Sequence, residues 1–423
     1  MFLKRIFAIK SVKDFFYMFT SNIVKKLIGF LREMILAYVF GTSLIYSFFL
    51  LLRTIPDLLS QFTFGNALQA NLLPKLTKHF NANKNVSYNN LFLFTKRSLV
   101  YLFIITQVIQ LIIIWQLNTE YTLLLIVISV LLTLLVIANF FNSIFLTVLQ
   151  AEGKFKQHSV GTTLNLFIST FLLYPLTFIC NIFGIVFSRL IGVLFLARVY
   201  IYPIFKRKES NEIKIGLSDF SFSILLLGNF SSLLIMLSRF IAGTDGDNNI
   251  AYFNYSIVLL NVVLTAIIAN VNTLMLRKLS INKEIKWLVY SLLVALFFGV
   301  CLYLLAYNFS DELINFIYHR GAFSLSDVQH TASYFRQMTI PIIILLISSV
   351  LMQPYFTLNI NLHKRYSKRL SFFILFCLLI VLSVLFFLDL NARERSLYLL
   401  YVMSVMSLFL SFFVCFKYLK HED

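Results

Sequence analysis

The chain has 423 residues, of which 59% are hydrophobic and only 13% are charged. Soluble globular domains carry about 25% charged residues, so the composition excludes an ordinary water-soluble protein. The formal net charge of +18 would suit nucleic acid, but the basic residues lie in short segments between long apolar stretches. That placement is typical of a membrane protein that contacts membrane lipids. No nucleic-acid partner is therefore expected.

The apolar stretches predict the fold class. A bilayer-spanning helix needs about 20 predominantly apolar residues. Twelve stretches qualify, which predicts an all-α polytopic membrane protein with about twelve transmembrane helices in two six-helix lobes around a central cavity. The lobes are expected at 1–208 and 209–423, and the longest outer loop at 308–330. The helices are expected at 15–40, 44–73, 98–117, 121–149, 159–180, 182–204, 216–241, 249–276, 287–307, 331–360, 370–389 and 396–416.

The distribution of positive charge predicts the orientation. With the N-terminus inside, 25 of the 36 Lys and Arg residues fall in cytoplasmic segments. Only Arg320, Arg393 and Arg395 fall in outer loops. Because cytoplasmic loops of membrane proteins are enriched in Lys and Arg, both termini are expected in the cytoplasm. The expected location is the bacterial cytoplasmic, or inner, membrane.

The first helix carries charges that its apolar context does not favour. Lys25 and Arg32 are seven residues apart and share one face, while Lys26 and Glu33 share a neighbouring face. A charge at the centre of a membrane helix costs about 2.5–3.5 kcal/mol. The pattern therefore predicts a cationic face on a polar cavity. Two alternatives stay open: the lysines reach the cytoplasmic surface, and Arg32 forms a structural ion pair with Glu33.

The second helix also contains opposite charges. Arg53 and Asp57 are spaced i, i+4 and can pair within the helix. Pro56 lies between them and removes a backbone donor, which predicts a kink. The alternative interpretation is a neutralised pair in the core of a bundle.

Four further arginines lie within predicted spans. Arg189 and Arg198 are nine residues apart, hence about 180° apart on an ideal helix, and cannot both face one cavity. Arg239 and Arg336 are expected near the outer face as interfacial anchors.

Acidic residues in the outer loops raise the possibility of an enzyme. A membrane-embedded glycosyltransferase would need acid–base or metal-binding carboxylates, and the candidates are Asp245, Asp247, Asp311 and Glu312. The segment from Asp245 fails the calcium-loop pattern, which requires Gly and Glu where this chain has Ile250 and Ser256. It is therefore expected to be a polar turn. No catalytic residue, metal or cofactor is expected, apart from a coupling ion of unspecified identity.

The outer loop near residue 320 also contains a helix-start pattern. Ser324 followed by Asp327 has the spacing of an N-terminal cap.

Several short runs resemble, in order and spacing, the MviN/MurJ family of lipid II flippases. This family belongs to the multidrug/oligosaccharidyl-lipid/polysaccharide exporter superfamily. The runs occur over residues 15–360 and are Lys26-Leu-Ile-Gly29-Phe-Leu-Arg32-Glu33, Phe40-Gly41, Ile55-Pro56-Asp57-Leu58-Leu59, Pro74-Lys-Leu, Leu149-Gln150-Ala-Glu-Gly153-Lys-Phe155 and Arg320-Gly-Ala-Phe323-Ser324.

The resemblance implies two lobes around a cationic cavity, with alternating access driven by membrane potential or an ion gradient. The implied cargo is a polyprenyl-pyrophosphate-linked saccharide, and the implied partners are membrane lipids and cell-envelope biosynthesis proteins. Arg32 corresponds to a pyrophosphate-binding arginine, Lys26 stands where the family usually has arginine, and Glu33 matches an acidic neighbour. The expected substrate-binding residues are Lys25, Lys26, Arg32, Glu33, Arg53 and Asp57.

Departures from the family pattern bear on the cargo. Ser47 replaces an acidic residue, Asp57 replaces Asn, and Ser60-Gln61 replaces a basic pair. Val258 and Asn261 stand where the family has Arg and Glu. Family members usually have fourteen helices. The expected cargo is lipid II-like, and the alternative is an O-antigen, capsule or exopolysaccharide repeat unit. A multidrug exporter is less favoured, because organic cations require carboxylates.

Overall fold

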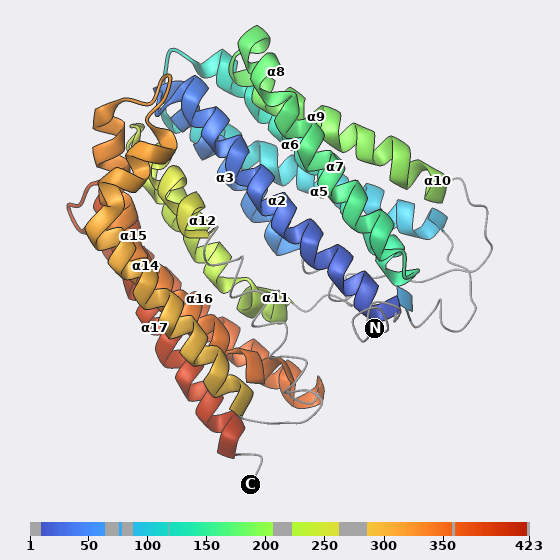
Figure 1. Ribbon diagram of the computed structural model, residues 1–423, viewed down its shortest axis with the longest axis vertical. Helices are drawn as coiled ribbons and strands as arrows, with labels where there is room; N and C mark the ends of the chain where they lie inside the picture. The colour runs from blue at the N-terminus through green and yellow to red at the C-terminus, as the bar shows by residue number, and fades with distance from the viewer. Residues whose placement is uncertain are drawn as a thin grey trace, which may run out of the picture. The chain divides into compact units, whose positions relative to one another are not determined.

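The computed structural model describes residues 10–63, 76–77, 88–117, 119–205, 222–261, 286–357 and 360–420. Within these ranges the chain consists of helices joined by short turns, with no strand (Figure 1). The predicted all-α fold class is therefore confirmed. The chain separates into two compact units, Met1–Ile35 with Leu52–Ser221, and Leu36–Leu51 with Phe222–Asp423.

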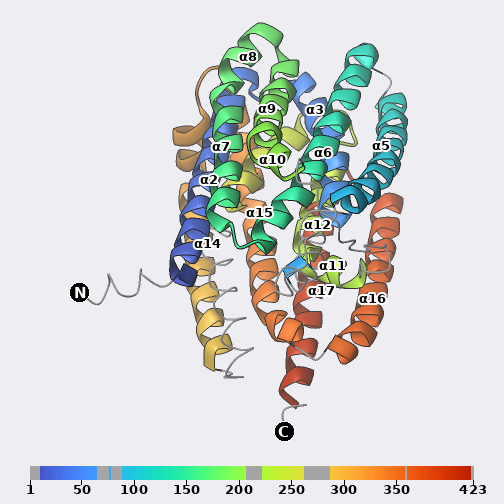
Figure 2. The same ribbon diagram turned by 90° about the vertical axis from the view of Figure 1, so that its right-hand side faces the viewer.

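The first unit is built mainly from long apolar helices. Its described elements are α2 (Lys10–Phe40, up to Ile35), α3 (Leu44–Thr63, from Leu52), α5 (Tyr88–Leu117), α6 (Thr122–Ala151), α7 (Phe155–Phe171), α8 (Leu173–Cys180), α9 (Ile182–Leu196), the π-helical turn η1 (Ala197–Ile201) and α10 (Tyr202–Phe205). Figure 2 shows α6 between α5 and α9. Buried Phe145 and Val148 of α6 belong to one core cluster with Leu102 and Leu196.

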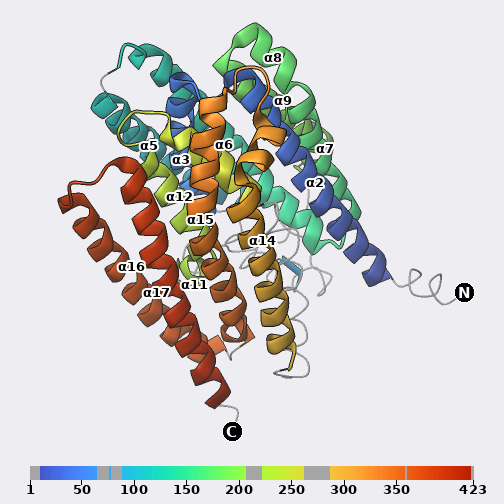
Figure 3. The ribbon, with the colours of Figure 1, turned by 60° about the vertical axis from the view of Figure 1, so that its left-hand side comes forward.

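The second unit takes the turn between α2 and α3 together with the C-terminal half of the chain. Its other described elements are α11 (Phe222–Gly228), α12 (Phe230–Ala242), a helix over 249–261, α14 (Lys286–Tyr318), α15 (Leu325–Leu351), the 3₁₀ turn η3 (Gln353–Thr357), α16 (Ile360–Phe387) and α17 (Ala392–Lys420). Helix α15 packs beside α14 and α17 (Figure 3). The expected division into lobes at 1–208 and 209–423 stays a prediction.

Among the described residues, seven helices are long and apolar enough to cross a membrane, or eight when the bent pair α7–α8 counts as one span. Large apolar side chains such as Trp115, Phe178 and Phe387 lie 80–88% exposed. Exposed apolar side chains suit contact with lipid. The helical backbone can lie there too, because it satisfies its own hydrogen bonds. The chain is a multi-pass membrane protein. Parts of the expected spans at 44–73, 216–241, 249–276 and 331–360 lie outside the described residues.

The expected outer loop at 308–330 is wrong. Helix α14 continues to Tyr318 through an irregular residue, Phe309 (φ −128°, ψ 20°), so only His319–Ser324 connects it to α15. The predicted helix start is confirmed, because Ser324 and Asp327 form a reciprocal capping box. The backbone N–H of Ser324 donates to Asp327 Oδ2 at 2.8 Å, and the Asp327 N–H donates to Ser324 Oγ at 3.3 Å.

Candidate anion-binding site

In the first unit, two charged side chains of α2 are buried, and the charged side chains of α3 and α9 are half-buried. Arg32 and Glu33 are only 3% and 7% exposed. Arg32 Nη2 donates to the carbonyl oxygen of Ile185 on α9 at 3.4 Å. On α3, Arg53 Nε lies 3.2 Å from Asp57 Oδ2, so the pair predicted from the i, i+4 spacing is confirmed.

Arg189 brings a third guanidinium to the same region. It lies on α9 one turn beyond Ile185, and it interacts electrostatically with Arg32, Arg53, Asp57 and Glu33. These five side chains are called the cationic cluster below. Three guanidiniums and two carboxylates leave one excess positive charge. A planar guanidinium can donate two parallel hydrogen bonds to a phosphate group. The arrangement can therefore hold an anionic, phosphate-bearing group.

The two lysines of α2 lie apart from this cluster. Lys25 Nζ donates to Thr162 Oγ1 of α7 at 3.5 Å, whereas Lys26 is exposed. Ser21 Oγ, one turn earlier, lies 2.8 Å from Thr163 Oγ1. Seven residues of helix separate Lys25 from Arg32, or about 10 Å along the axis. The structure thus brings four of the six predicted site residues together and places Lys25 and Lys26 further along α2.

A buried polar network borders the Arg53–Asp57 pair. Gln110 of α5 is fully buried, and its Nε2 donates to the carbonyl oxygen of Leu52 at 3.0 Å. Its Oε1 accepts from Gln107 Nε2 at 3.2 Å and from Thr133 Oγ1 at 3.0 Å. Sequence reasoning missed both Gln110 and the role of Arg189. The available signal for Gln110 was two glutamines, three residues apart, in a largely apolar span.

The remaining arginines divide between surface and interior. Arg198 is exposed over the ring of Tyr202, 4.8 Å from its centroid. This confirms that Arg189 and Arg198 do not face one site. Arg239 is 8% exposed and donates to Asn254 Oδ1 at 3.2 Å, so its interpretation as an interfacial anchor is wrong.

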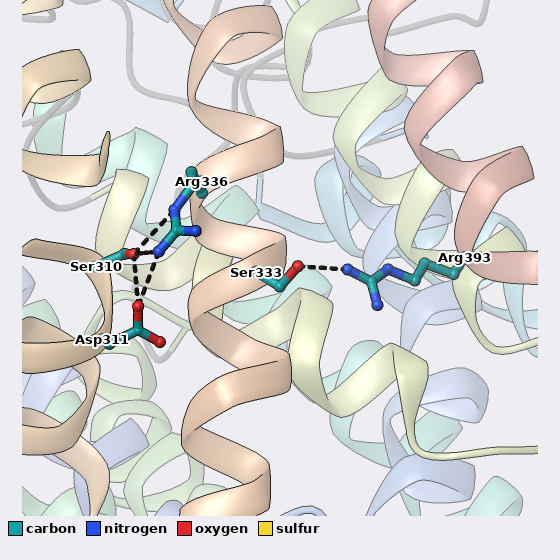
Figure 4. Close-up of polar contacts among 5 residues, drawn as sticks. All are labelled: Ser310, Asp311, Ser333, Arg336 and Arg393. Atoms are coloured by element: carbon teal, nitrogen blue, oxygen red, sulfur yellow. Dashed lines mark hydrogen bonds and ion pairs between the residues drawn. The ribbon is translucent and has the colours of Figure 1, made fainter. Parts of the chain in front are cut away.

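Arg336 is half-exposed on α15 (Figure 4). Its Nη2 pairs with Asp311 Oδ2 at 2.8 Å and donates to Ser310 Oγ at 2.6 Å. Arg393 of α17 donates to the Oγ of Ser333, which also lies on α15, at 2.7 Å (Figure 4).

Three of the acidic candidates for an enzyme form hydrogen bonds or an ion pair within the protein. Asp245 Oδ2 accepts from the N–H of Ala392 at 2.7 Å, and Asp247 Oδ1 accepts from the N–H of Asn249 at 3.0 Å. Burial raises the pKa of Asp247, and the nearby carboxylate of Asp245 adds to that rise. Asp311 lies on α14 and pairs with Arg336. In the described part of the chain, no group of three His, Cys, Asp or Glu side chains is placed to hold a metal.

The turn between α2 and α3 lies in a close-fitting seat of the second unit. Gly41 has φ +53°, and a Cβ built on it would lie 2.4 Å from the carbonyl oxygen of Ala322. Tyr255 OH donates to the carbonyl oxygen of Gly41 at 2.8 Å, and Thr42 Oγ1 donates to Asp327 Oδ1 at 2.6 Å. We call these five residues the turn seat. Two of the runs quoted above, Phe40-Gly41 and Arg320–Ser324, therefore meet in space.

A second glycine contributes to the same fit. Gly321 has φ +62°, and a Cβ there would lie 2.4 Å from the carbonyl oxygen of Tyr38. The N–H of Ala322 donates to that carbonyl at 2.9 Å. Only glycine adopts this conformation without strain and leaves room for the opposing backbone.

No model of a known protein family matches this sequence, and no curated protein matches it either. Solved structures do share its fold. A structure described as lipid II flippase MurJ in an inward closed conformation matches with a TM-score of 0.72 and 17% identity, covering 93% of this chain and 86% of that one.

Two further solved structures extend the comparison. An inward-facing multidrug resistance MATE family transporter of the MOP superfamily matches with a TM-score of 0.61 and 14% identity over 97% of this chain and 96% of that one. A MOP superfamily transporter from Pyrococcus furiosus, described as having a binding pocket of reverse polarity, gives 0.58 and 14% over 96% of each chain.

The chain therefore shares a polytopic helical fold with these solved structures. The resemblance of the short sequence runs to the MviN/MurJ signatures agrees with this similarity in fold to MurJ.

Proposed function

We propose that this protein is a flippase that moves an undecaprenyl-pyrophosphate-linked saccharide across the cytoplasmic membrane. The cargo would be a lipid II-like peptidoglycan precursor, carried from the inner to the outer leaflet by alternating access. The observation that carries the proposal is the cationic cluster, in which Arg32, Arg53 and Arg189 converge within one unit of a transporter fold.

The chemistry of the cluster suits a pyrophosphate better than a cation. Burying cations in a membrane protein is costly unless an opposite charge compensates them. Glu33 and Asp57 compensate two of the three guanidiniums, so an anionic headgroup would balance the remaining charge. The polyprenyl tail can stay in lipid while only the headgroup crosses. A multidrug exporter of organic cations would instead need an excess of carboxylates.

The same proposal covers location and partners. The enrichment of Lys and Arg in the expected cytoplasmic segments favours the inner membrane with both termini inside. A flippase of this kind would receive its cargo from enzymes that build lipid-linked saccharides and deliver it to those that polymerise them.

The test is rescue of bacteria depleted of their resident lipid II flippase. Lipid II accessible at the outer face of the inner membrane is measured in cells that express this chain. We expect the wild-type chain to rescue the cells. Arg32→Ala and Arg189→Ala should each lower the amount of accessible lipid II at least about tenfold, because each removes a donor to the pyrophosphate.

Arg198→Ala is the matched control, since this arginine follows on the same run of helix but is exposed. It should rescue like the wild type at equal amounts of membrane-inserted protein. Rescue by Arg32→Ala and Arg189→Ala equal to the control would overturn the binding site. No rescue by a folded, inserted wild-type chain would exclude lipid II and favour another undecaprenyl-linked saccharide.

A further inference from the structure

Helix α3 lacks one rung of its hydrogen-bond ladder. In an α-helix the N–H of residue 56 would donate to the carbonyl oxygen of Leu52. Position 56 is a proline, which has no N–H and whose ring crowds the carbonyl four residues earlier. The Leu52 carbonyl is thus left without its helical donor in a buried part of the first unit.

Gln110 of α5 supplies the missing donor from outside the helix. Its Nε2 lies 3.0 Å from the Leu52 carbonyl oxygen. The orientation of the carboxamide is determined by its other contacts, because Oε1 accepts from Gln107 and Thr133. Turning the amide over would set two oxygens against each other at Leu52 and two amino groups against each other at Gln107. The network therefore aims the Gln110 amino group at Leu52.

The hydrogen bond from Gln110 to the Leu52 carbonyl lies next to the Arg53–Asp57 ion pair on α3. Arg53 directly follows Leu52, and Asp57 directly follows Pro56. Arg53 Nε lies 3.2 Å from Asp57 Oδ2, along the same helical turn. A shift of this turn would move both groups relative to Arg189, with which both interact electrostatically. The turn also begins where α3 passes from the second unit to the first, between Leu51 and Leu52.

We infer that Gln110 is a positioning residue of the transport site: its carboxamide replaces the donor that Pro56 lacks and thereby holds Arg53 and Asp57 in the cationic cluster. The inference rests on the proposed function. Glutamine suits the task because one side chain donates to Leu52 while it accepts from α5 and α6. Leucine would leave the Leu52 carbonyl without a donor and would remove an acceptor that Gln107 and Thr133 share. Glutamate would face the carbonyl with acceptors alone.

The test is a double-mutant cycle on the full-length protein in nanodiscs, with Gln110→Leu, Pro56→Ala and the double variant. Thermal unfolding and the Kd for inorganic pyrophosphate are measured for each. Gln110→Leu should lower Tm by about 2–4 °C and weaken pyrophosphate binding at least about fivefold. Alanine at position 56 restores the backbone N–H, so in that background Gln110→Leu should change the Kd less than about twofold.

Gln116→Leu is the matched control, because it makes the same substitution at an exposed site of the same helix. It should leave both quantities at the wild-type value. Equal losses from Gln110→Leu in the wild-type and in the Pro56→Ala background would overturn the inference, since Gln110 would then act independently of the missing rung. If none of the proteins bound pyrophosphate, the proposed function would be contradicted. The Tm values of the double-mutant cycle would still test whether Gln110 replaces the donor that Pro56 lacks.

Discussion

Helices α2 and α3 and the turn between them contribute to two regions of opposite construction, the turn seat and the cationic cluster. In the turn seat, backbone lies directly on backbone: Gly41 has no room for a methyl group against Ala322, and the seat is closed by hydrogen bonds of 2.6–2.8 Å. In the cationic cluster, the α2 and α3 legs of the hairpin present long charged side chains, with Arg32 3.4 Å from the Ile185 carbonyl and Arg53 3.2 Å from Asp57.

The difference separates two requirements of the proposed flippase, a fixed turn and an exchangeable ligand site. A seat built from backbone fixes the position of the turn and tolerates no added atom. Flexible arginines around a small charge excess can exchange partners as an anion arrives or leaves. Substitutions should therefore act on stability in the turn seat and on ligand affinity in the cationic cluster.

The largest effect is expected from Gly41→Ala. The left-handed conformation costs a non-glycine residue about 1–2 kcal/mol, and overpacking against the Ala322 carbonyl adds about 1–3 kcal/mol. Thermal unfolding of the purified protein should show a marked fall in Tm and in the yield of monodisperse protein.

Gly29→Ala provides the matched control on the same hairpin. Gly29 lies inside helix α2, and a Cβ there meets nothing within 4 Å. Alanine should be neutral or stabilise by about 0.5–1 kcal/mol, since glycine is unfavourable inside helices. Equal Tm values for the two variants would show that the seat yields, and the contrast between the regions would fail.

A smaller effect on stability but a clear one on affinity is expected from Asp57→Asn. The substitution raises the charge excess of the cationic cluster by one and frees Arg53 for the ligand. Because the pair is partly exposed, stability should fall by less than about 1 kcal/mol. Pyrophosphate should bind about threefold more tightly, with a steeper dependence on salt, as measured by calorimetry at two ionic strengths.

Glu152→Gln makes the same charge change elsewhere in the first unit, at the ion pair with Lys154. It should leave the pyrophosphate Kd unchanged. Weaker binding by Asp57→Asn than by this control would mean that the carboxylate is needed to place Arg53.

The smallest effect is expected in the loop that contains Asp247, which belongs to neither region. Burial raises the pKa of this carboxyl, so the folded protein holds the proton more tightly than the unfolded chain. The charged form therefore costs stability at neutral pH, and this cost disappears as the pH falls through the raised pKa towards the ordinary carboxyl value. Asp247→Asn should raise Tm slightly at neutral pH. The difference in Tm between the variant and the wild type should become smaller as the pH is lowered.

Asp389→Asn, at an exposed site outside this loop, is the matched control and should leave Tm at neutral pH unchanged. A difference in Tm between Asp247→Asn and the wild type that stays constant with pH would contradict the assigned cause.

The sequence predicted the helices well because apolar periodicity and length are local properties. The i, i+4 spacing of Arg53 and Asp57 likewise predicted their ion pair, and the Ser324–Asp327 spacing predicted a cap. The outer loop was misjudged because Asp311 and Glu312 end the apolar run, although α14 continues as a helix past them to Tyr318.

The long-range parts of the site were not accessible from sequence. Arg189 looked equivalent to Arg198 until the packing of α9 placed it with Arg32 and Arg53. The role of Gln110 can be recognised only from its contact with the Leu52 carbonyl, which lies 58 residues earlier in the chain and lacks its helical donor. Pairings of this kind depend on tertiary packing and leave no periodic pattern.

The turn seat has a consequence for biogenesis. Thr42 and Asp327, which hydrogen-bond there, are 285 residues apart in the chain. At a synthesis rate of about 5–20 residues per second, roughly 15–60 s separate their emergence from the ribosome. The α2–α3 turn is therefore synthesised long before Ala322 and Asp327, its partners in the turn seat. The second unit completes its fold around the oldest turn of the chain, so a nascent protein truncated before residue 320 would lack the partner of its first hairpin.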